Sequence, residues 1–213
     1  MPAGRRVIDV SENNGTATWL PIDWAQVVAS RQVEGVYVRA SLGALRADQA
    51  FSRNWAALRR SPLLQGIYVY ALPGATPNVT AHAQHQAQFV WGILRQNGGP
   101  HQDDLPPMLD VEVTGGLAPA TLQAWTAAAL AELSALAGKP AVLYSDEWFL
   151  VTYLKPLLAQ HPIWIAAYQA QCPSLPGAHV VAWQFSPRGR IPGIHTPVDC
   201  DEWYGPWPAA TGR

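Results

Sequence analysis

Residues 105–138, LPPMLDVEVTGGLAPATLQAWTAAALAELSALAG, contain the pattern that decides the fold. The apolar run over residues 106–112 has the length and composition of a buried strand, and residues 118–138 show the spacing of a helix. Pro119 in the first turn and Gly138 at the end are typical helix boundaries. The stretch is therefore predicted to form one strand–helix unit.

The same alternation of strand and helix is predicted five times along the chain. The strand-like runs are residues 6–11, 35–41, 66–72, 106–112 and 141–145. The helix-like segments that follow them are residues 21–32, 48–61, 77–97, 118–138 and 146–160. Strand–helix units of this kind imply parallel strands joined by right-handed crossovers.

The rhythm changes in the last part of the chain. Three strand-like runs, residues 162–169, 179–186 and 196–203, follow one another with short connections and no room for helices. Tight connections imply that some of these strands pair in antiparallel fashion. We therefore predict an α/β fold, an irregular eight-stranded TIM-like barrel in which five strand–helix units precede three strands. A regular barrel usually needs about 250 residues, so this one is expected to be shortened.

Composition and net charge indicate how many domains the chain has and which kinds of partner it is not expected to bind. The chain has 213 residues, 49% of them hydrophobic and 14% charged, with a net charge of -1, and no linker divides it. We expect residues 1–213 to form a single catalytic domain, and a monomer. The absence of a basic cluster argues against nucleic acid as a partner. No apolar run has the length of a membrane span or of a signal peptide, so neither a membrane partner nor a visible signal is expected.

Metal and cofactor motifs are also missing from the sequence. His82 and His85 lie three residues apart on a predicted helix, but no carboxylate follows as in zinc proteases, so we expect an exposed helix face. No glycine loop matches a phosphate cradle, and no cofactor or metal is expected. Cys172 and Cys200 are predicted near the same rim. They form either one disulfide or two free thiols, and synthesis in the cytosol favours free thiols.

Carboxylates recur where the predicted strands end. Asp9, Asp110, Glu112 and Asp199 all fall at strand C-termini, the end at which parallel barrels carry their chemistry. Residues two apart on a strand face the same side, so Asp110 and Glu112 are expected to share a face. Acids that converge on one mouth repel, and one of them then keeps its proton at neutral pH. A protonated carboxyl beside a charged carboxylate is what glycosidic bond cleavage requires. Each acid alone would fit a solvated strand edge or turn equally well.

Aromatic side chains accompany these acids. Tyr68, Tyr144 and Tyr168 carry hydroxyl groups that need partners when buried, which suits a polar mouth. Trp183, in the seventh strand, is a further candidate for binding substrate. Core packing is the alternative for each, and for Trp164 it is the favoured interpretation.

Arg39 is a basic residue in the interior of the predicted strand over residues 35–41. A buried arginine needs an acidic partner. We expect Asp9 or Glu112 to supply it, which would place Arg39 among the substrate-binding residues.

Together these segments resemble glycoside hydrolase family 25, the Chalaropsis-type lysozymes. The matching stretches occur in the family's order and cover nearly the whole chain: IDVSENNG, GVYVRASLG, DQAFSRNW, GIYVYAL, MLDVEVTGG, VLYSDEWF, IWIAAY and VVAWQFSPRGRIPGIHTPVDCDEW. The resemblance implies an N-acetylmuramidase that hydrolyses the β-1,4 bond between N-acetylmuramic acid and N-acetylglucosamine in peptidoglycan. It also implies action at the bacterial cell wall, as the catalytic domain of a phage endolysin released through a holin, or after secretion by another route.

The resemblance also implies roles for individual residues. Glu112 matches the general acid, and Asp110 matches the acid that acts as nucleophile or stabilises a substrate-assisted intermediate. Asp9 and Asp199 match two further acids of the site. The residues that match substrate-lining aromatics are Tyr68, Tyr144 and Tyr168.

Three departures and two alternatives accompany this interpretation. The family's K-A-T-E-G is Arg39-Ala40-Ser41-Leu42-Gly43 here, its Y-H-F is Tyr68-Val69-Tyr70, and its V-D-L-N is Val198-Asp199-Cys200-Asp201. None of them removes a candidate catalytic acid. One alternative is a module on the same barrel that binds cell-wall glycan without cutting it. The other is a different retaining glycosidase such as a chitinase, although the longer D-x-x-D-x-D-x-E run of chitinases is missing before Glu112.

Overall fold

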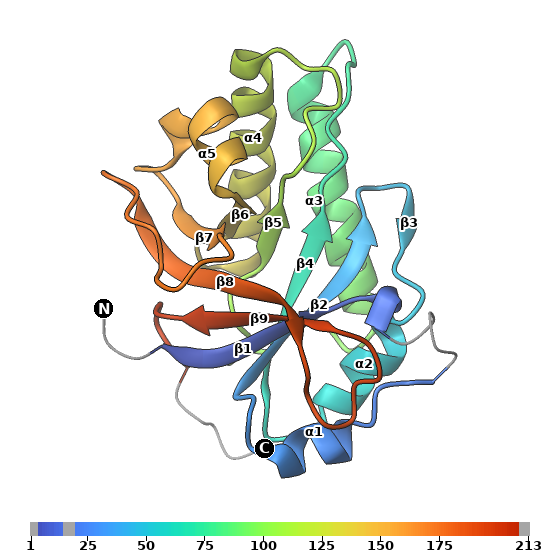
Figure 1. Cartoon of the computed structure of the whole chain (residues 1–213). Coiled ribbons are helices and arrows are strands. Elements are labelled where there is room, and N and C mark those ends of the chain that lie inside the picture. Colours follow the sequence, from blue (N-terminus) through green and yellow to red (C-terminus); the bar gives the residue numbers. More distant parts are fainter. Residues whose placement is uncertain (1–3, 15–19, 209–213) are drawn as a thin grey trace.

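The computed structural model describes residues 4–14 and 20–208, so residues 1–3, 15–19 and 209–213 of the predicted domain lie outside the described part. Eight strands close into a barrel (Figure 1), because β1 pairs with β2 as well as with β9. The strands are β1 Arg5–Val10, β2 Gly35–Leu42, β4 Leu64–Tyr70, β5 Met108–Asp110, β6 Val142–Asp146, β7 Pro162–Ala166, β8 His179–Gly189 and β9 Val198–Trp203. The predicted α/β barrel is confirmed.

The strand directions follow the connections. From β1 through β2, β4, β5, β6 and β7 to β8, neighbouring strands are parallel, whereas β9 is antiparallel to both β8 and β1. The predicted antiparallel pairing in the last part of the chain is thus correct for β8 and β9. β7 and β8 are parallel, because the connection of residues 167–178 crosses back along the barrel without a helix.

Five helices follow the first five barrel strands, as predicted. They are α1 Trp24–Ser30, α2 Phe51–Leu58, α3 Val79–Gln96, α4 Pro119–Ala137 and α5 Glu147–Tyr153. Side-chain caps set several of their starts. Asp23 accepts a hydrogen bond from the backbone of Gln26, so α1 begins later than the predicted residue 21. Asp146 caps α5 in the same way, and α5 ends before the 3-10 turn that contains Pro156.

Two short elements near the N-terminal half were not predicted. A 3-10 turn over Glu12–Asn14 follows β1, and the two-residue strand β3, Arg46–Ala47, pairs with the end of β2. Both are too short to leave a periodic pattern in the sequence. They matter for the site because they carry acidic and basic side chains toward the open end of β2.

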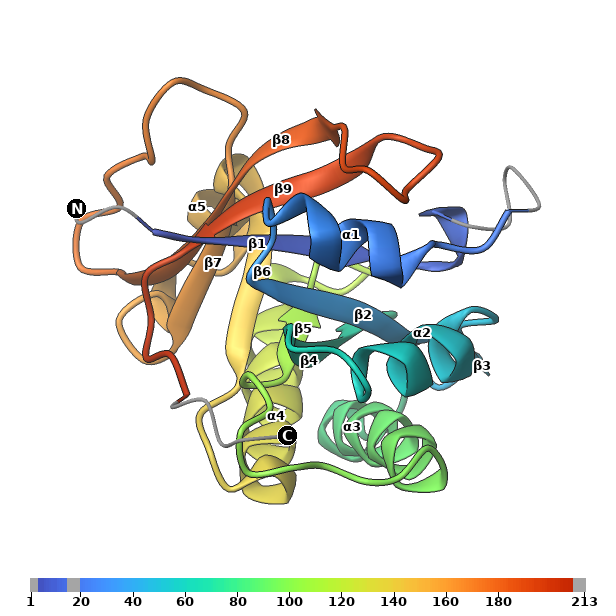
Figure 2. The same cartoon turned by 90° about the horizontal axis from the view of Figure 1, so that it is seen from below.

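The β8–β9 loop lies beside α1 on the outside of the barrel (Figure 2). The backbone N–H of Asp23, next to α1, donates to the carbonyl of Gly193 in that loop, at 2.9 Å. Gly193 has a φ of 94°, and a Cβ atom there would lie 2.4 Å from the Asp23 oxygen. Only glycine fits this contact, which seats the β8–β9 loop on α1.

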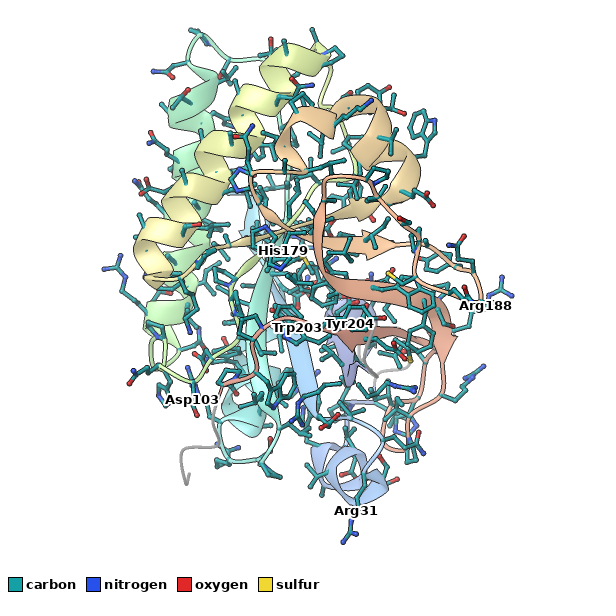
Figure 3. All side chains as sticks on the ribbon, turned by 90° about the vertical axis from the view of Figure 1, so that its left-hand side faces the viewer. Arg31, Asp103, His179, Arg188, Trp203 and Tyr204 are labelled. Atoms are coloured by element: carbon teal, nitrogen blue, oxygen red, sulfur yellow. The ribbon has the colours of Figure 1, made fainter. Side chains whose placement is uncertain are left out.

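Aromatic side chains fill the interior of the barrel below the strand C-termini. Tyr37 lies edge-on to Trp164 at 4.7 Å between ring centroids, and Trp164 lies edge-on to Trp203 at 6.0 Å. Trp164 is fully buried, which confirms its predicted role in the core. Figure 3 shows Trp203 within this packing, with Arg31 and Arg188 extending outward to solvent. The polar end of the barrel is the other end, where the C-termini of the parallel strands lie.

Candidate active site

A cavity of about 300 Å³ lies at the C-terminal ends of the barrel strands. Most of the predicted site residues line it: Asp9, Arg39, Tyr68, Asp110, Glu112, Tyr144, Tyr168 and Asp199. Tyr70, Gln184 and Ser11 line it as well, although sequence reasoning did not assign them to the site. We call this space the acid cavity.

Strand register explains why the acids converge. Asp9 on β1 lies directly opposite Asp199 on β9, and Asp110 on β5 lies between Tyr70 on β4 and Tyr144 on β6. All five belong to the inward-facing set of their strands, since side chains alternate between the two faces. The barrel thus brings residues from both ends of the chain to one wall.

Glu112 reaches the cavity from a loop. The predicted strand over residues 106–112 ends at Asp110, so Glu112 lies two residues beyond β5 and its side chain is exposed. Asp110 is buried, and its Oδ1 atom has no hydrogen-bond partner among the described residues. The two neighbouring carboxyl groups therefore lie in different environments, one at the rim and one inside the barrel.

Gln184 connects three of the cavity residues. Its Oε1 atom accepts hydrogen bonds from the hydroxyl groups of Tyr144 and Tyr168, both at 2.9 Å. Its Nε2 atom donates to Asp9 Oδ2 at 2.9 Å. This buried amide fixes two aromatic rings and one acid at once. Its only signal in the sequence is its place beside Trp183 in the WQFS stretch.

Arg39 lines the cavity with partners other than those predicted. Its Nε atom donates to Asp48 Oδ2 at 2.9 Å, and its guanidinium lies 3.2 Å from Glu12. The prediction of Asp9 or Glu112 is wrong because the chain after β3 folds back on β2, where Asp48 N donates to the carbonyl of Ala40. Arg39 therefore forms part of a buried ion-pair network at the edge of the cavity.

Trp183 does not reach the acid cavity. Its indole N–H donates to the carbonyl of Ala167 at 2.7 Å, and its ring packs 5.6 Å from Phe185 in the outer core. Because Gln184 points into the barrel, its two neighbours on β8 point outward. Trp183 therefore lies apart from the other residues predicted for the site, which line the acid cavity.

Burial raises the pKa values of the inner acids. The pKa of Asp9 lies well above its usual range because of burial and then the charge of Asp199, although the hydrogen bond from Gln184 works against this. Burial, followed by the charge of Glu112, also holds the pKa of Asp110 well above its usual range. Both acids therefore bind a proton more tightly than an exposed aspartate does.

The rim acids are shifted less. Burial raises the pKa of Asp199 to about 6. Burial, then the charges of Asp146 and Asp199, raise the pKa of Glu112. We expected repulsion between the acids to raise the pKa of one of them, and the charges of Asp146 and Asp199 act on Glu112 in this way. The repulsion between Glu112 and Asp110 acts on the pKa of Asp110. Asp146, at the start of α5, was not predicted to influence the site.

A fifth acid lies beneath the cavity. Asp201 has no exposed surface, and its Oδ1 atom accepts a hydrogen bond from the indole of Trp164 at 3.1 Å. Burial and then the charge of Asp9 hold its pKa well above the usual range. Asp201 was not predicted, although its position two residues after Asp199 on β9 places it on the same face.

Other residues with chemical potential lie apart from this cavity. Cys172 and Cys200 are both free thiols. His82 accepts a hydrogen bond from the indole of Trp125 at 3.0 Å, so its ring is not simply solvated as expected. Within residues 4–14 and 20–208, no group of three or more His, Cys, Asp or Glu side chains is arranged to hold a metal ion. None of the described helices is long and apolar enough to span a membrane.

Comparison with known proteins gives concordant matches. The family described as glycosyl hydrolases family 25 matches residues 8–194. Lysozyme M1 of Streptomyces globisporus is 27% identical over 214 residues, which cover 95% of this chain and 69% of that protein. The crystal structure of a bacterial lysozyme from Streptomyces coelicolor matches with a TM-score of 0.79 and 25% identity, over 96% of this chain and 94% of that one.

A further relative is longer than this chain. The protein YegX of Escherichia coli (strain K12) is 31% identical over 188 residues, which cover 86% of this chain. The match covers 65% of YegX, so the chain spans just under two thirds of that relative.

Proposed function

Since this chain belongs to glycosyl hydrolases family 25, we propose that it is a peptidoglycan muramidase. The bond it hydrolyses is the β-1,4 linkage between N-acetylmuramic acid and N-acetylglucosamine. The observation that carries the proposal is the acid cavity, in which Asp110 and Glu112 lie in different environments and both have raised pKa values. A similar lysozyme fold, the autolysin LytC of Streptococcus pneumoniae, has been crystallised with a synthetic peptidoglycan ligand.

Glu112 is the proton donor in this proposal. It is the exposed member of the pair, so it can contact the glycosidic oxygen of a strand lying across the cavity. Its raised pKa keeps it protonated at higher pH than an ordinary glutamate, which general acid catalysis requires. As the bond breaks, the proton passes to the departing sugar oxygen.

Asp110 meets the positive charge that develops on the sugar. Its unpaired Oδ1 atom is available to act as nucleophile or to stabilise an intermediate formed by the substrate's own 2-acetamido group. Asp110 and Glu112 titrate as a pair. The reactive form is the one in which Glu112 holds the proton and Asp110 carries the charge.

The remaining cavity residues position these two acids and the sugar. Gln184 holds the rings of Tyr144 and Tyr168 in place and connects them to Asp9. Asp199 supplies charge at the rim, which favours the protonated form of Glu112. In this arrangement the chain works as a monomer on glycan strands of the bacterial cell wall, and an endolysin is the form of wall-lytic enzyme we favour.

Analysis of the products tests the proposal. Purified peptidoglycan is digested, the new reducing ends are reduced with borohydride, and the acid hydrolysate is analysed for amino sugar alcohols. We expect muramitol to appear with the native protein and to be strongly reduced with Glu112→Gln. Glucosaminitol would favour a chitinase-like specificity, and binding without any new reducing ends would favour the glycan-binding module.

A further inference from the structure

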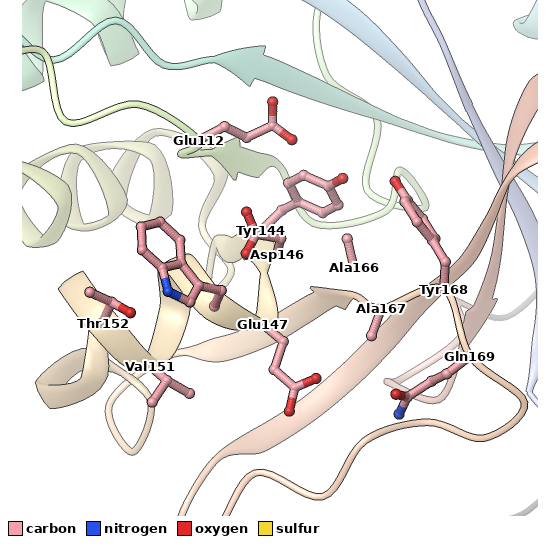
Figure 4. A pocket seen from close by; sticks show the side chains of 11 residues that line it. Glu112, Tyr144, Asp146, Glu147, Val151, Thr152, Ala166, Ala167, Tyr168 and Gln169 are labelled. Atoms are coloured by element: carbon pink, nitrogen blue, oxygen red, sulfur yellow. The ribbon is translucent and has the colours of Figure 1, made fainter.

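A second, larger hollow lies beside the acid cavity. It has a volume of about 730 Å³ and runs between α5 and the residues that follow β7 (Figure 4). Glu112, Tyr144 and Tyr168 line both spaces, so the two adjoin. The small side chains of Ala166 and Ala167 also line it, which leaves room for a bulky ligand. We call this hollow the α5 groove.

Exposed apolar side chains gather along the α5 groove. Six large hydrophobic residues are exposed in the described part of the chain, and three of them, Trp148, Val151 and Tyr168, line this groove. Trp148 is 64% exposed at the start of α5. Such clustering marks a binding surface, because single exposed apolar residues are normally scattered.

The two exposed aromatic rings of the groove, those of Trp148 and Tyr168, each make a contact that restricts their orientation. Trp148 lies edge-on to Tyr153 at 5.6 Å, with an angle of 80° between the rings. Tyr168 is anchored by its hydrogen bond to Gln184. Rigid aromatic faces bind ligands at a low cost in conformational entropy, and the flat apolar face of a sugar ring suits them.

The acidic side chains that line the α5 groove favour neutral sugars over anionic ones. Its lining includes Glu112, Asp146 and Glu147, and no lysine or arginine is among its described lining residues. Carboxylates accept hydrogen bonds from hydroxyl and amide N–H groups, but they repel an anionic ligand. A neutral N-acetylhexosamine therefore fits better than a sugar that carries a lactyl carboxylate.

We propose that the α5 groove binds an N-acetylglucosamine unit of the glycan strand, with its ring stacked on Trp148. This inference rests on the proposed function, because adjacency to the acid cavity is what places the strand there. Binding in the groove would add contacts between the enzyme and the glycan strand, so that the affinity for long substrates depends on a residue outside the acid cavity.

Steady-state kinetics on soluble, uncross-linked glycan strands test the role of Trp148. We expect Trp148→Ala to raise KM about 10-fold, as for aromatic residues that dominate binding sites, with kcat within about 2-fold of the native value. Trp148→Phe should recover much of the loss. Leu45→Ala is the matched control, because Leu45 is 74% exposed and lies outside the groove. An unchanged KM for Trp148→Ala, or a fall in kcat alone, would overturn the proposal.

A binding measurement separates the groove from the catalytic assignment. In a spectrum of the indole N–H groups, Trp148→Phe identifies the Trp148 resonance among those of the 10 tryptophans. Addition of chitotriose, a neutral N-acetylglucosamine oligomer, should shift that resonance saturably in the native protein and in Glu112→Gln. A silent Trp148 resonance in a protein that releases muramitol would reject the groove and keep the muramidase. A saturable shift in a protein that releases no muramitol would keep the groove and reject the muramidase.

Discussion

The acids of this barrel fall into two groups that share a chemistry and differ in environment. The inner acids, Asp9, Asp110 and Asp201, are buried among strands, and their pKa values lie well above the usual range. The rim acids, Glu112 and Asp199, contact solvent and are shifted less, with the pKa of Asp199 raised to about 6. Depth in the barrel, more than residue type, thus decides how far the pKa of each acid is raised.

This difference separates two tasks that a glycosidase site has to perform. A rim acid can contact a polymeric strand and exchange its proton with water between turnovers. An inner acid is shielded from water, so its charge or its hydrogen bond acts strongly on a bound sugar. Glu112 and Asp110 are the members of the two groups that lie two residues apart, which makes this pair the sharpest place to test the comparison.

The largest effect is expected from substitutions in this pair. Glu112→Gln should lower kcat at least about 100-fold by removing the proton donor. Asp110→Asn should lose a comparable factor, because the charge that stabilises the transition state is gone. Both variants should fold and still bind wall fragments. The measurement is release of reducing ends, with Glu132→Gln as the control, because Glu132 accepts a hydrogen bond from the exposed Gln88 on the neighbouring helix, away from the acid cavity.

The outcome of that experiment bears on the comparison itself. Loss of activity in Asp110→Asn alone would place the chemistry with the inner acids. Near-native lysis by Glu112→Gln would remove the rim acid from the reaction.

The inner and rim groups also differ in how far sequence could predict them. Asp9, Asp110 and Glu112 were located by one rule, that acids at the C-terminal ends of the strands of a parallel barrel meet at its mouth. Asp199 was also assigned to a strand C-terminus, but it lies at the N-terminal end of β9 and reaches the mouth because β9 is antiparallel to its neighbours. Whether an acid is inside or at the rim depends on where its strand stops, and the sequence pattern over residues 106–112 placed that end two residues too late.

Partners that come from distant segments were harder to predict. Arg39 was assigned the wrong acids because the short strand β3 carries Asp48 toward it, and two residues leave no periodic signal. Gln184 was missed, although alternation along β8 would have placed it inside the barrel as soon as Trp183 was placed outside. Long elements with clear periodicity were predictable, and short turns and side-chain pairing were not.

The next effect concerns the amide that connects the two groups. Gln184→Ala removes two hydrogen bonds from tyrosines and one to Asp9. Leaving such groups buried without partners should lower the free energy of unfolding by about 1–3 kcal/mol. We expect kcat/KM to fall about 10-fold as Tyr168 loses its fixed orientation. Denaturant unfolding and kinetics should both report the change, and Gln88→Ala, on the exposed face of α3, should report neither.

The effect of Asp201→Asn on thermal stability tests whether the pKa of an inner acid is raised in the folded state. Its pKa is raised in the folded state, so the native protein binds its proton more tightly than the unfolded chain does. Stability is therefore lost as pH rises above the ordinary aspartate value of about 3.9. Asp201→Asn keeps an oxygen that can accept from Trp164 and removes this loss. Its melting temperature should match the native value near pH 4 and exceed it at pH 8, by roughly 2–4 °C for each kcal/mol recovered. A lower melting temperature at pH 8 would show that the buried carboxyl is stabilising.

The smallest effect should come from Asp146, which acts on the rim acid without touching the inner ones. Its Oδ1 atom caps α5 by accepting from the backbone of Phe149 at 2.9 Å, and asparagine caps helices equally well. Asp146→Asn thus preserves the helix and removes one of the charges that raise the pKa of Glu112. Without that charge Glu112 ionises at lower pH, so the alkaline limb of the kcat/KM profile should move to lower pH. At pH values below the limb the kcat/KM of the variant should equal that of the native enzyme.

A limb that stays in place would mean that burial alone sets the proton affinity of Glu112. A limb that moves to higher pH would mean that Glu112 is not the proton donor.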